Sequence, residues 1–143
     1  MAKRKKTTVA QEVEKAAKLL QRYVRLKASD DNGYCTCITC GKVDHYKAMQ
    51  GGHFIPRGRT ILKLYEPNIQ VQCASCNCWG MKQAHYVLRY REWMVDYYGE
   101  RRVKAMEKLA WRTAPKFDRQ EVIEYQKELK EKIRDEEYRI GEY

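Results

Sequence analysis

The sequence predicts a mostly helical α+β fold with a small central core between long helices. Two Cys-x2-Cys pairs, Cys37/Cys40 and Cys73/Cys76, lie about 30 residues apart, which is the spacing of a four-thiolate zinc site. The chain between the pairs contains short alternating segments and glycines, as expected for strands and tight loops. Long amphipathic segments precede and follow this region. We therefore expect the core to be held together by structural zinc.

Cysteine usage favours zinc over disulfide bonds. No apolar run approaches the roughly 18 residues of a membrane span, and the basic start MAKRKKTT is not followed by the apolar segment of a secretory signal. We therefore expect no membrane association and a reducing, cytoplasmic location, where such cysteine pairs bind metal. Cys35 could compete with Cys37 as a ligand, but the x2 spacing favours Cys37. Cys35 and Cys78 are expected to be packing residues.

Positive charge is concentrated in the first 117 residues. The chain has a net charge of +10, and residues 118–143 hold only 6 of its 29 Lys/Arg but 9 of its 19 Asp/Glu. A basic body of this kind suits a polyanion, most simply nucleic acid. A basic surface that serves only solubility would have the same composition. The acidic last segment argues against DNA contact at that end of the chain.

The chain is predicted to form helices on both sides of the core. Its basic start could lie along phosphates or remain a solvated terminus. Thr7 or Thr8 can cap the first helix, and Asp118 can cap the last. Helices are predicted for residues 8–27, 77–99, 100–111 and 118–140. The four predicted parts are a basic arm (1–6), an N-terminal helix and turn (7–34), a zinc-bound core (35–98) and a C-terminal helical extension (99–143).

Two extended segments are predicted inside the core. The first covers residues 42–55 and leads into GGHFIPRGR, where two glycines allow close backbone approach before His53. The second, residues 68–73, alternates like a strand. Asn77 is predicted to open a helix. The resulting order is zinc pair, strand ending in histidine, loop, strand, zinc pair and helix, which is the order of a ββα-metal (HNH-like) nuclease core.

This order suggests phosphodiester hydrolysis, which needs a base, a divalent cation and cationic groups for the phosphates. Imidazole titrates near neutrality, so His53 is suited to act as the base. Asn77 offers an amide oxygen, a ligand type that hard ions such as Mg²⁺ or Mn²⁺ accept. Arg57 and Arg59 follow His53 closely and could contact phosphates.

Each of these residues also has a structural interpretation. His53 could be a packing histidine, Asn77 a helix cap, and Arg57 and Arg59 solvated loop residues. Two groups of residues are weaker candidates: Lys82 and Arg89 as DNA contacts, and His45 and His85, which are expected to be ordinary polar residues.

Several motifs resemble the phage NinG (Rap) recombination protein family. They are LLQRYVRLKASD, CITCG, GGHFIPRGR, EPNIQVQC, CASCN and YYGERRVKAMEKL. They occur in the family's order, and the similarity covers roughly residues 17–111. The resemblance implies a structure-specific DNA endonuclease that cuts branched recombination intermediates, such as Holliday junctions and D-loops, in the cytoplasm of a host cell.

The central part is also similar to phage endonuclease VII, a zinc-stapled junction resolvase of the ββα-metal type. That similarity implies that His53 is the general base and that Asn77 binds the catalytic Mg²⁺ or Mn²⁺. Asn68 matches the middle Asn of HNH motifs, which orients the base and its loop. Resolving a four-way junction needs two symmetric cuts, so we expect a homodimer joined through the N- or C-terminal helix.

Gly52 departs from the family pattern. HNH enzymes usually place an Asp or His as a metal ligand just before the base histidine, and here that position is glycine. Asp44, Glu66 or a water could replace the ligand, or metal binding could be weaker. A further alternative is a non-catalytic, zinc-stapled DNA-binding accessory protein of recombination.

Overall fold

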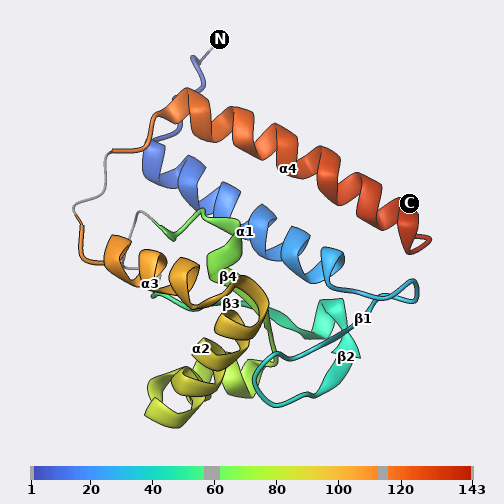
Figure 1. The fold of residues 1–143 in the computed structure, drawn as a ribbon. Coiled ribbons are helices and arrows are strands. Elements are labelled where there is room, and N and C mark those ends of the chain that lie inside the picture. Colours follow the sequence, from blue (N-terminus) through green and yellow to red (C-terminus); the bar gives the residue numbers. More distant parts are fainter. Residues whose placement is uncertain (1, 57–61, 113–115, 143) are drawn as a thin grey trace.

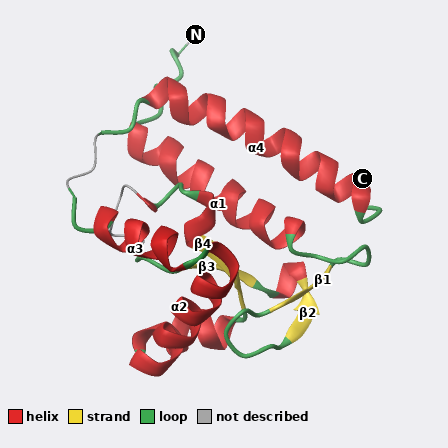
Figure 2. Cartoon of the chain, viewed as in Figure 1, coloured by secondary structure: helices red, strands yellow, loops and turns green. Residues whose placement is uncertain are grey.

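Two long helices, α1 (Val9–Lys27) and α4 (Arg119–Arg139), lie side by side across one side of the molecule (Figure 1). The structure is a computed structural model that describes residues 2–56, 62–112 and 116–142. A second helix pair, α2 (Ala84–Tyr98) and α3 (Glu100–Leu109), lies on the other side of the small β3–β4 sheet, and the β1–β2 hairpin lies to the right of α2 in the view (Figure 2). The predicted mostly helical α+β class is confirmed. No helix in the described ranges is long and apolar enough to cross a membrane.

Both long helices begin where the sequence predicts, because local caps determine their starts. Thr8 accepts a hydrogen bond from the backbone of Gln11, and the Gln11 side chain accepts one from the backbone of Thr8, which makes a capping box. Asp118 accepts a hydrogen bond from the backbone of Glu121 at the start of α4. The apolar face of α1 is buried and consists of Val13, Ala16, Ala17, Leu20, Val24 and Leu26.

A buried polar contact joins α1 to α4 beside this apolar face. The Glu12 carboxylate accepts hydrogen bonds from the Thr7 hydroxyl and from Gln126 Nε2, the latter at 2.7 Å. These bonds hold the pKa of Glu12 down to about 2. The ionised form of Glu12 therefore stabilises the packing of the two helices.

Replacing Glu12 with glutamine is expected to remove part of the protein's acid sensitivity. Because the folded-state pKa lies below the ordinary value of 4.5, the stabilisation is complete above that pH and is lost as the pH falls towards 2. Thermal unfolding midpoints measured from about pH 6 to about pH 3 should fall more steeply for the wild type than for Glu12→Gln. Acid release of zinc affects both proteins alike, so parallel curves would show that Glu12 contributes nothing.

Two antiparallel hairpins form the sheets. Strand β1 (Tyr34–Thr36) pairs with β2 (Val43–His45), and β3 (Gln50–His53) pairs with β4 (Ile69–Gln72). The prediction of a strand within residues 68–73 is confirmed. The single extended arm predicted for residues 42–55 is wrong, because a 3₁₀ turn, capped by His45, separates β2 from β3.

The start predicted for the second helix is also wrong. Asn77 lies in a π-helical turn, Ser75–Trp79, which is followed by a 3₁₀ turn, and α2 begins only at Ala84. The first turn has to bring the sulfur of Cys76 to the other cysteines, so it does not continue straight into α2. The chain leaves helical geometry at Gln83, whose backbone is extended, directly before α2. At Gly80 a Cβ would lie only 2.7 Å from the ring of Tyr86.

Candidate functional site

The four cysteines predicted to bind zinc come together in space. The sulfur atoms of Cys37, Cys40, Cys73 and Cys76 all lie within 4.8 Å of one another. Tetrahedral Zn–S bonds of about 2.3 Å correspond to S···S distances of about 3.8 Å, and the Cys40 and Cys73 sulfurs are 3.8 Å apart. The cluster is therefore consistent with a zinc site that ties the chain before β2 to the chain after β4.

The remaining two cysteines lie outside this cluster. Cys35 is buried in the core and Cys78 is exposed, and both are free thiols. Within the cluster, burial raises the pKa of Cys76. Burial also acts on Cys37, but hydrogen bonds from the surrounding backbone outweigh it and lower the pKa of Cys37 to about 7.

His53 is the last residue of β3, and contacts from two sides fix its position. Its Nε2 atom lies 3.3 Å from the carbonyl oxygen of Lys63. A carbonyl can only accept a hydrogen bond, so this contact places the proton on Nε2 and makes Nδ1 the basic nitrogen. The preceding carbonyl, that of Gly52, accepts a hydrogen bond of 2.7 Å from the hydroxyl of Tyr90, a fully buried residue of α2.

Asn68 anchors the backbone on both sides of residues 57–61. It is completely buried just before β4. Its Oδ1 accepts from the backbone N–H of Ile55 at 2.8 Å. Its Nδ2 donates to the carbonyls of Ile55 and Leu62 at 3.0 and 3.2 Å. The segment that follows His53 is therefore held at both of its described ends by one side chain.

Asn77 lies beside the β3–β4 hairpin, and its orientation is set by a neighbour that the sequence did not identify. Its Nδ2 donates to Gln50 Oε1 at 2.7 Å, which turns Oδ1 towards Gly52. Asn77, Gln50, His53 and Lys82 all line one cavity of about 650 Å³. The structure thus brings the predicted base and the predicted oxygen ligand to the same cavity.

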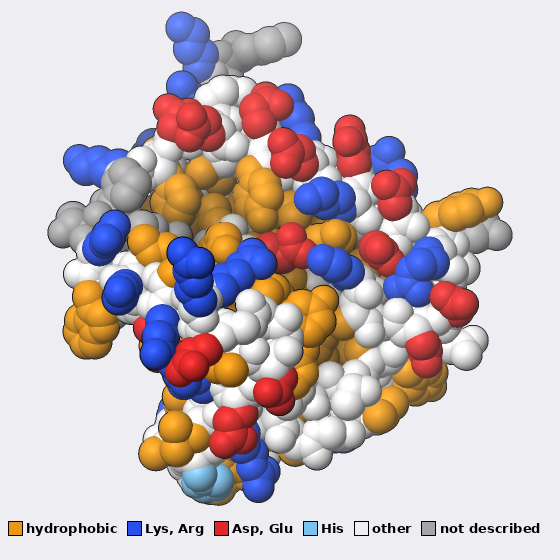
Figure 3. Space-filling model, in the orientation of Figure 1, with side chains coloured by type: hydrophobic (Ala, Val, Ile, Leu, Met, Phe, Trp, Pro, Cys, Tyr) orange, Lys and Arg blue, Asp and Glu red, His pale blue; other side chains and the backbone are white. Residues whose placement is uncertain are grey.

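Of the other predicted DNA contacts, the structure describes only Arg89. Arg89 is exposed on α2, and Arg57 and Arg59 fall outside the described residues. Figure 3 shows Lys and Arg side chains gathered over α3, a basic surface that the sequence analysis did not single out. Its exposed members on that helix are Arg101, Arg102, Lys104 and Lys108.

Neither carboxylate considered as a substitute for a side chain at Gly52 lies at this cavity. Asp44 pairs with Lys42 at 3.8 Å, and Glu66 pairs with Lys27 at 3.0 Å. A Cβ at position 52 would lie 1.9 Å from Gln72 Oε1, so any larger residue there would have to displace that side chain. Gln50 and Gln72 lie opposite each other in the hairpin. In the sequence, Gln50 could have been linked to this site only through the period-2 alternation of a strand, which puts residues 50 and 52 on the same face.

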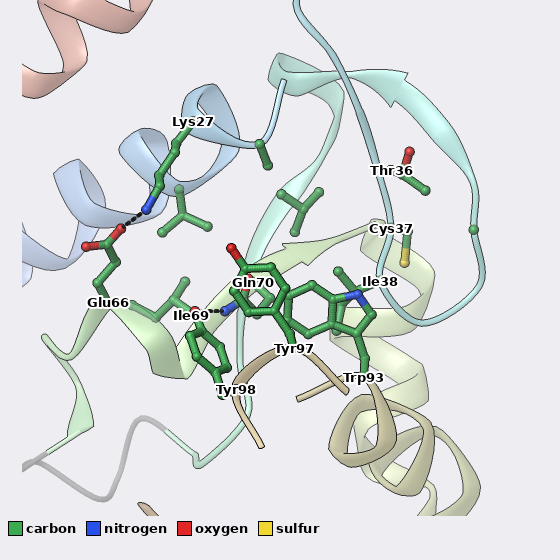
Figure 4. Close-up of a pocket in the computed structure, with 14 residues that line it drawn as sticks. Lys27, Thr36, Cys37, Ile38, Glu66, Ile69, Gln70, Trp93, Tyr97 and Tyr98 are labelled. Carbon is green, nitrogen blue, oxygen red and sulfur yellow. Dashed lines mark hydrogen bonds and ion pairs between the residues drawn. The ribbon is translucent and has the colours of Figure 1, made fainter. Parts of the chain in front are cut away.

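A second cavity, of about 520 Å³, lies between the end of α1, strand β4 and α2 (Figure 4). Trp93 and Tyr97 stack along its wall with ring centroids 5.0 Å apart, and Gln70 donates a hydrogen bond to the Tyr98 hydroxyl. Its described lining is mainly apolar and aromatic, and it includes neither His53 nor Asn77. The groups suited to hydrolysis are therefore found at the first cavity.

Comparison with known proteins gives one family match. A family model described as "Bacteriophage Lambda NinG protein" matches residues 1–138. No curated protein and no solved structure matches the chain.

Proposed function

Because the chain belongs to the bacteriophage lambda NinG protein family, and because His53 and Asn77 line one cavity, we propose that it is a metal-dependent endonuclease that cuts branched DNA. The shared cavity is the observation that carries the proposal. A lone histidine or a lone asparagine would be unremarkable, but a candidate base and a candidate metal ligand that line one cavity supply two of the groups that hydrolysis of a phosphodiester needs.

The arrangement of the elements supports the same proposal. A cysteine pair precedes the β3–β4 hairpin, His53 ends β3, and the second cysteine pair leads directly into the helical turn that holds Asn77. This is the order of a ββα-metal core. The structural zinc would hold His53 and Asn77 in register without taking part in the chemistry, since its four ligands are all protein thiolates.

In this proposal His53 Nδ1 accepts a proton from the attacking water, while the Lys63 carbonyl keeps the other ring nitrogen protonated. Asn77 Oδ1 helps to hold Mg²⁺ or Mn²⁺, and the uncharged oxygen donors around Gly52 fit such a hard ion. When bound, the cation supplies positive charge that stabilises the phosphate as it is cleaved. Lys82, Arg89 and the arginines of the segment after His53 contact neighbouring phosphates.

Two copies of the chain are proposed to act together, because resolving a four-way junction needs two symmetric cuts. The second candidate function is that of a non-catalytic accessory protein that binds branched DNA. The specific observation in its favour is Gly52, which leaves the site without the acidic or histidine ligand usual at that position.

Cleavage of a labelled four-way junction, beside a linear duplex of the same sequence, tests the proposal. The zinc-loaded protein should cut the junction when Mg²⁺ or Mn²⁺ is added, leave it intact without a divalent ion, and cut the linear duplex much more slowly. Tight binding of the junction with no cleavage under either metal would contradict the enzyme and establish the accessory function.

A further inference from the structure

One buried oxygen next to the proposed active site lacks a hydrogen-bond donor. Among the described residues, Gln72 Oε1 is the one buried side-chain polar atom without a partner, and Gln72 is 0% exposed. Its Nε2 donates to the Thr39 hydroxyl at 2.8 Å, which fixes the direction of the carboxamide. A buried acceptor without a donor is costly, so such an atom calls for an explanation.

The unpartnered oxygen lies where the side chain of residue 52 would begin. A Cβ at Gly52 would be 1.9 Å from Gln72 Oε1 and 3.0 Å from Asn77 Oδ1. The Asn77 atom that faces this point is Oδ1, an acceptor, because Nδ2 is turned towards Gln50. Two acceptor oxygens from different elements therefore converge above Gly52, and an electropositive group between them would satisfy both.

We propose that Gln72 Oε1 is a ligand of the divalent cation together with Asn77 Oδ1, in place of the side chain that Gly52 lacks. This inference rests on the proposed function and extends it. The oxygen comes from β4, the neighbouring strand, and reaches the space that a ligand on β3 would occupy. Gly52 is then part of the metal site, because any larger residue would displace the Gln72 oxygen.

An uncharged carboxamide attracts a cation less strongly than a carboxylate does. Two substitutions of Gln72 should therefore change the affinity for a divalent cation in opposite directions. Mn²⁺ binding to the full-length, zinc-loaded protein can be followed by electron paramagnetic resonance, without DNA. Gln72→Met removes the oxygen at similar volume and should weaken Mn²⁺ binding at least tenfold. Gln72→Glu keeps the oxygen and adds charge, and should tighten Mn²⁺ binding.

Gln70 provides a matched control, since it lies on the same strand and the same face, two residues away. Its side chain bonds to the Pro67 carbonyl and to Tyr98, away from Asn77. Gln70→Met should bind Mn²⁺ as the wild type does. Zinc content and the thermal unfolding midpoint of each variant identify any protein that has failed to fold, and if Gln72→Met fails, Gln72→Glu alone decides the matter.

Two outcomes would overturn the inference: no Mn²⁺ binding by the wild type, or Mn²⁺ binding that neither Gln72 variant changes. The second outcome is expected if the oxygen and nitrogen of the Gln72 carboxamide are exchanged by a 180° flip. The NH₂ group would then donate to Asn77, and the two variants would lower stability without changing Mn²⁺ binding. The cleavage assay separates this failure from that of the function. If the protein cuts DNA but its Mn²⁺ affinity does not depend on Gln72, only the assignment of Gln72 as a ligand is refuted. If it binds Mn²⁺ through Gln72 but does not cut DNA, only the proposed endonuclease activity is refuted.

Discussion

Replacing His53 with alanine is expected to lower the rate of metal-dependent junction cleavage by about 10²–10⁴-fold, the usual contribution of a general base. The side chain is half-buried at the end of β3, and its Nε2 lies 3.3 Å from the carbonyl oxygen of Lys63. Asn68 and Tyr90 hold the backbone around it independently of the imidazole. Zinc content, folding and junction affinity should therefore survive the change.

Single-turnover cleavage with saturating protein is the appropriate measurement, because it separates the chemical step from binding. His45→Ala is the matched control. His45 lies on β2, where it pairs with Glu142 at 3.4 Å and does not line the His53 cavity. Cleavage by His45→Ala should match the wild type within about twofold. If His53→Ala retained most of the wild-type rate, with zinc bound, another group would have to be the base.

Loss of zinc is expected to have the largest effect on stability. The apparent binding free energy of a structural zinc is about 10–16 kcal/mol in small zinc domains. Whole domains of this size are stable by only about 5–15 kcal/mol. Three of the four cluster thiols are buried, and Cys37, Cys73 and Cys76 belong to the main hydrophobic core with Leu20 and Val71. Removing the ion would leave three thiols at the centre of a core too small to compensate.

Cys76→Ser should therefore abolish stoichiometric zinc binding and cooperative thermal unfolding. Metal content by mass spectrometry and unfolding followed by circular dichroism measure the two effects. Cys78→Ser, two residues away and exposed, should keep both properties of the wild type. Cys35→Ser tests the competing ligand in the same way. A Cys76→Ser protein that still held one zinc and unfolded at the wild-type temperature would show that the cluster is not the zinc site.

The sequence determined the features whose causes are local. Thr8 with Gln11, and Asp118 with Glu121, satisfy the exposed N–H groups of the first helical turn, so α1 and α4 begin at their caps in any tertiary context. The Cys-x2-Cys spacing likewise defines a two-ligand turn by itself, and two such turns can complete a tetrahedron. The motifs that resemble the NinG family are also short, local stretches of sequence, so they could be recognised without the structure. The family assignment is confirmed.

Only the tertiary structure decided which oxygens surround Gly52. The register of β3 against β4 pairs Gln72 with Gln50, and the Gln72 side chain reaches Gly52 diagonally across the hairpin. The turn after Cys76 brings Asn77 to the same point, so Gln50 and Gln72 become neighbours of a predicted ligand. Glu66 was a reasonable substitute by sequence, but it pairs with Lys27 instead. Strand register and long-range ion pairs depend on residues far apart in the chain, and no local pattern encodes them.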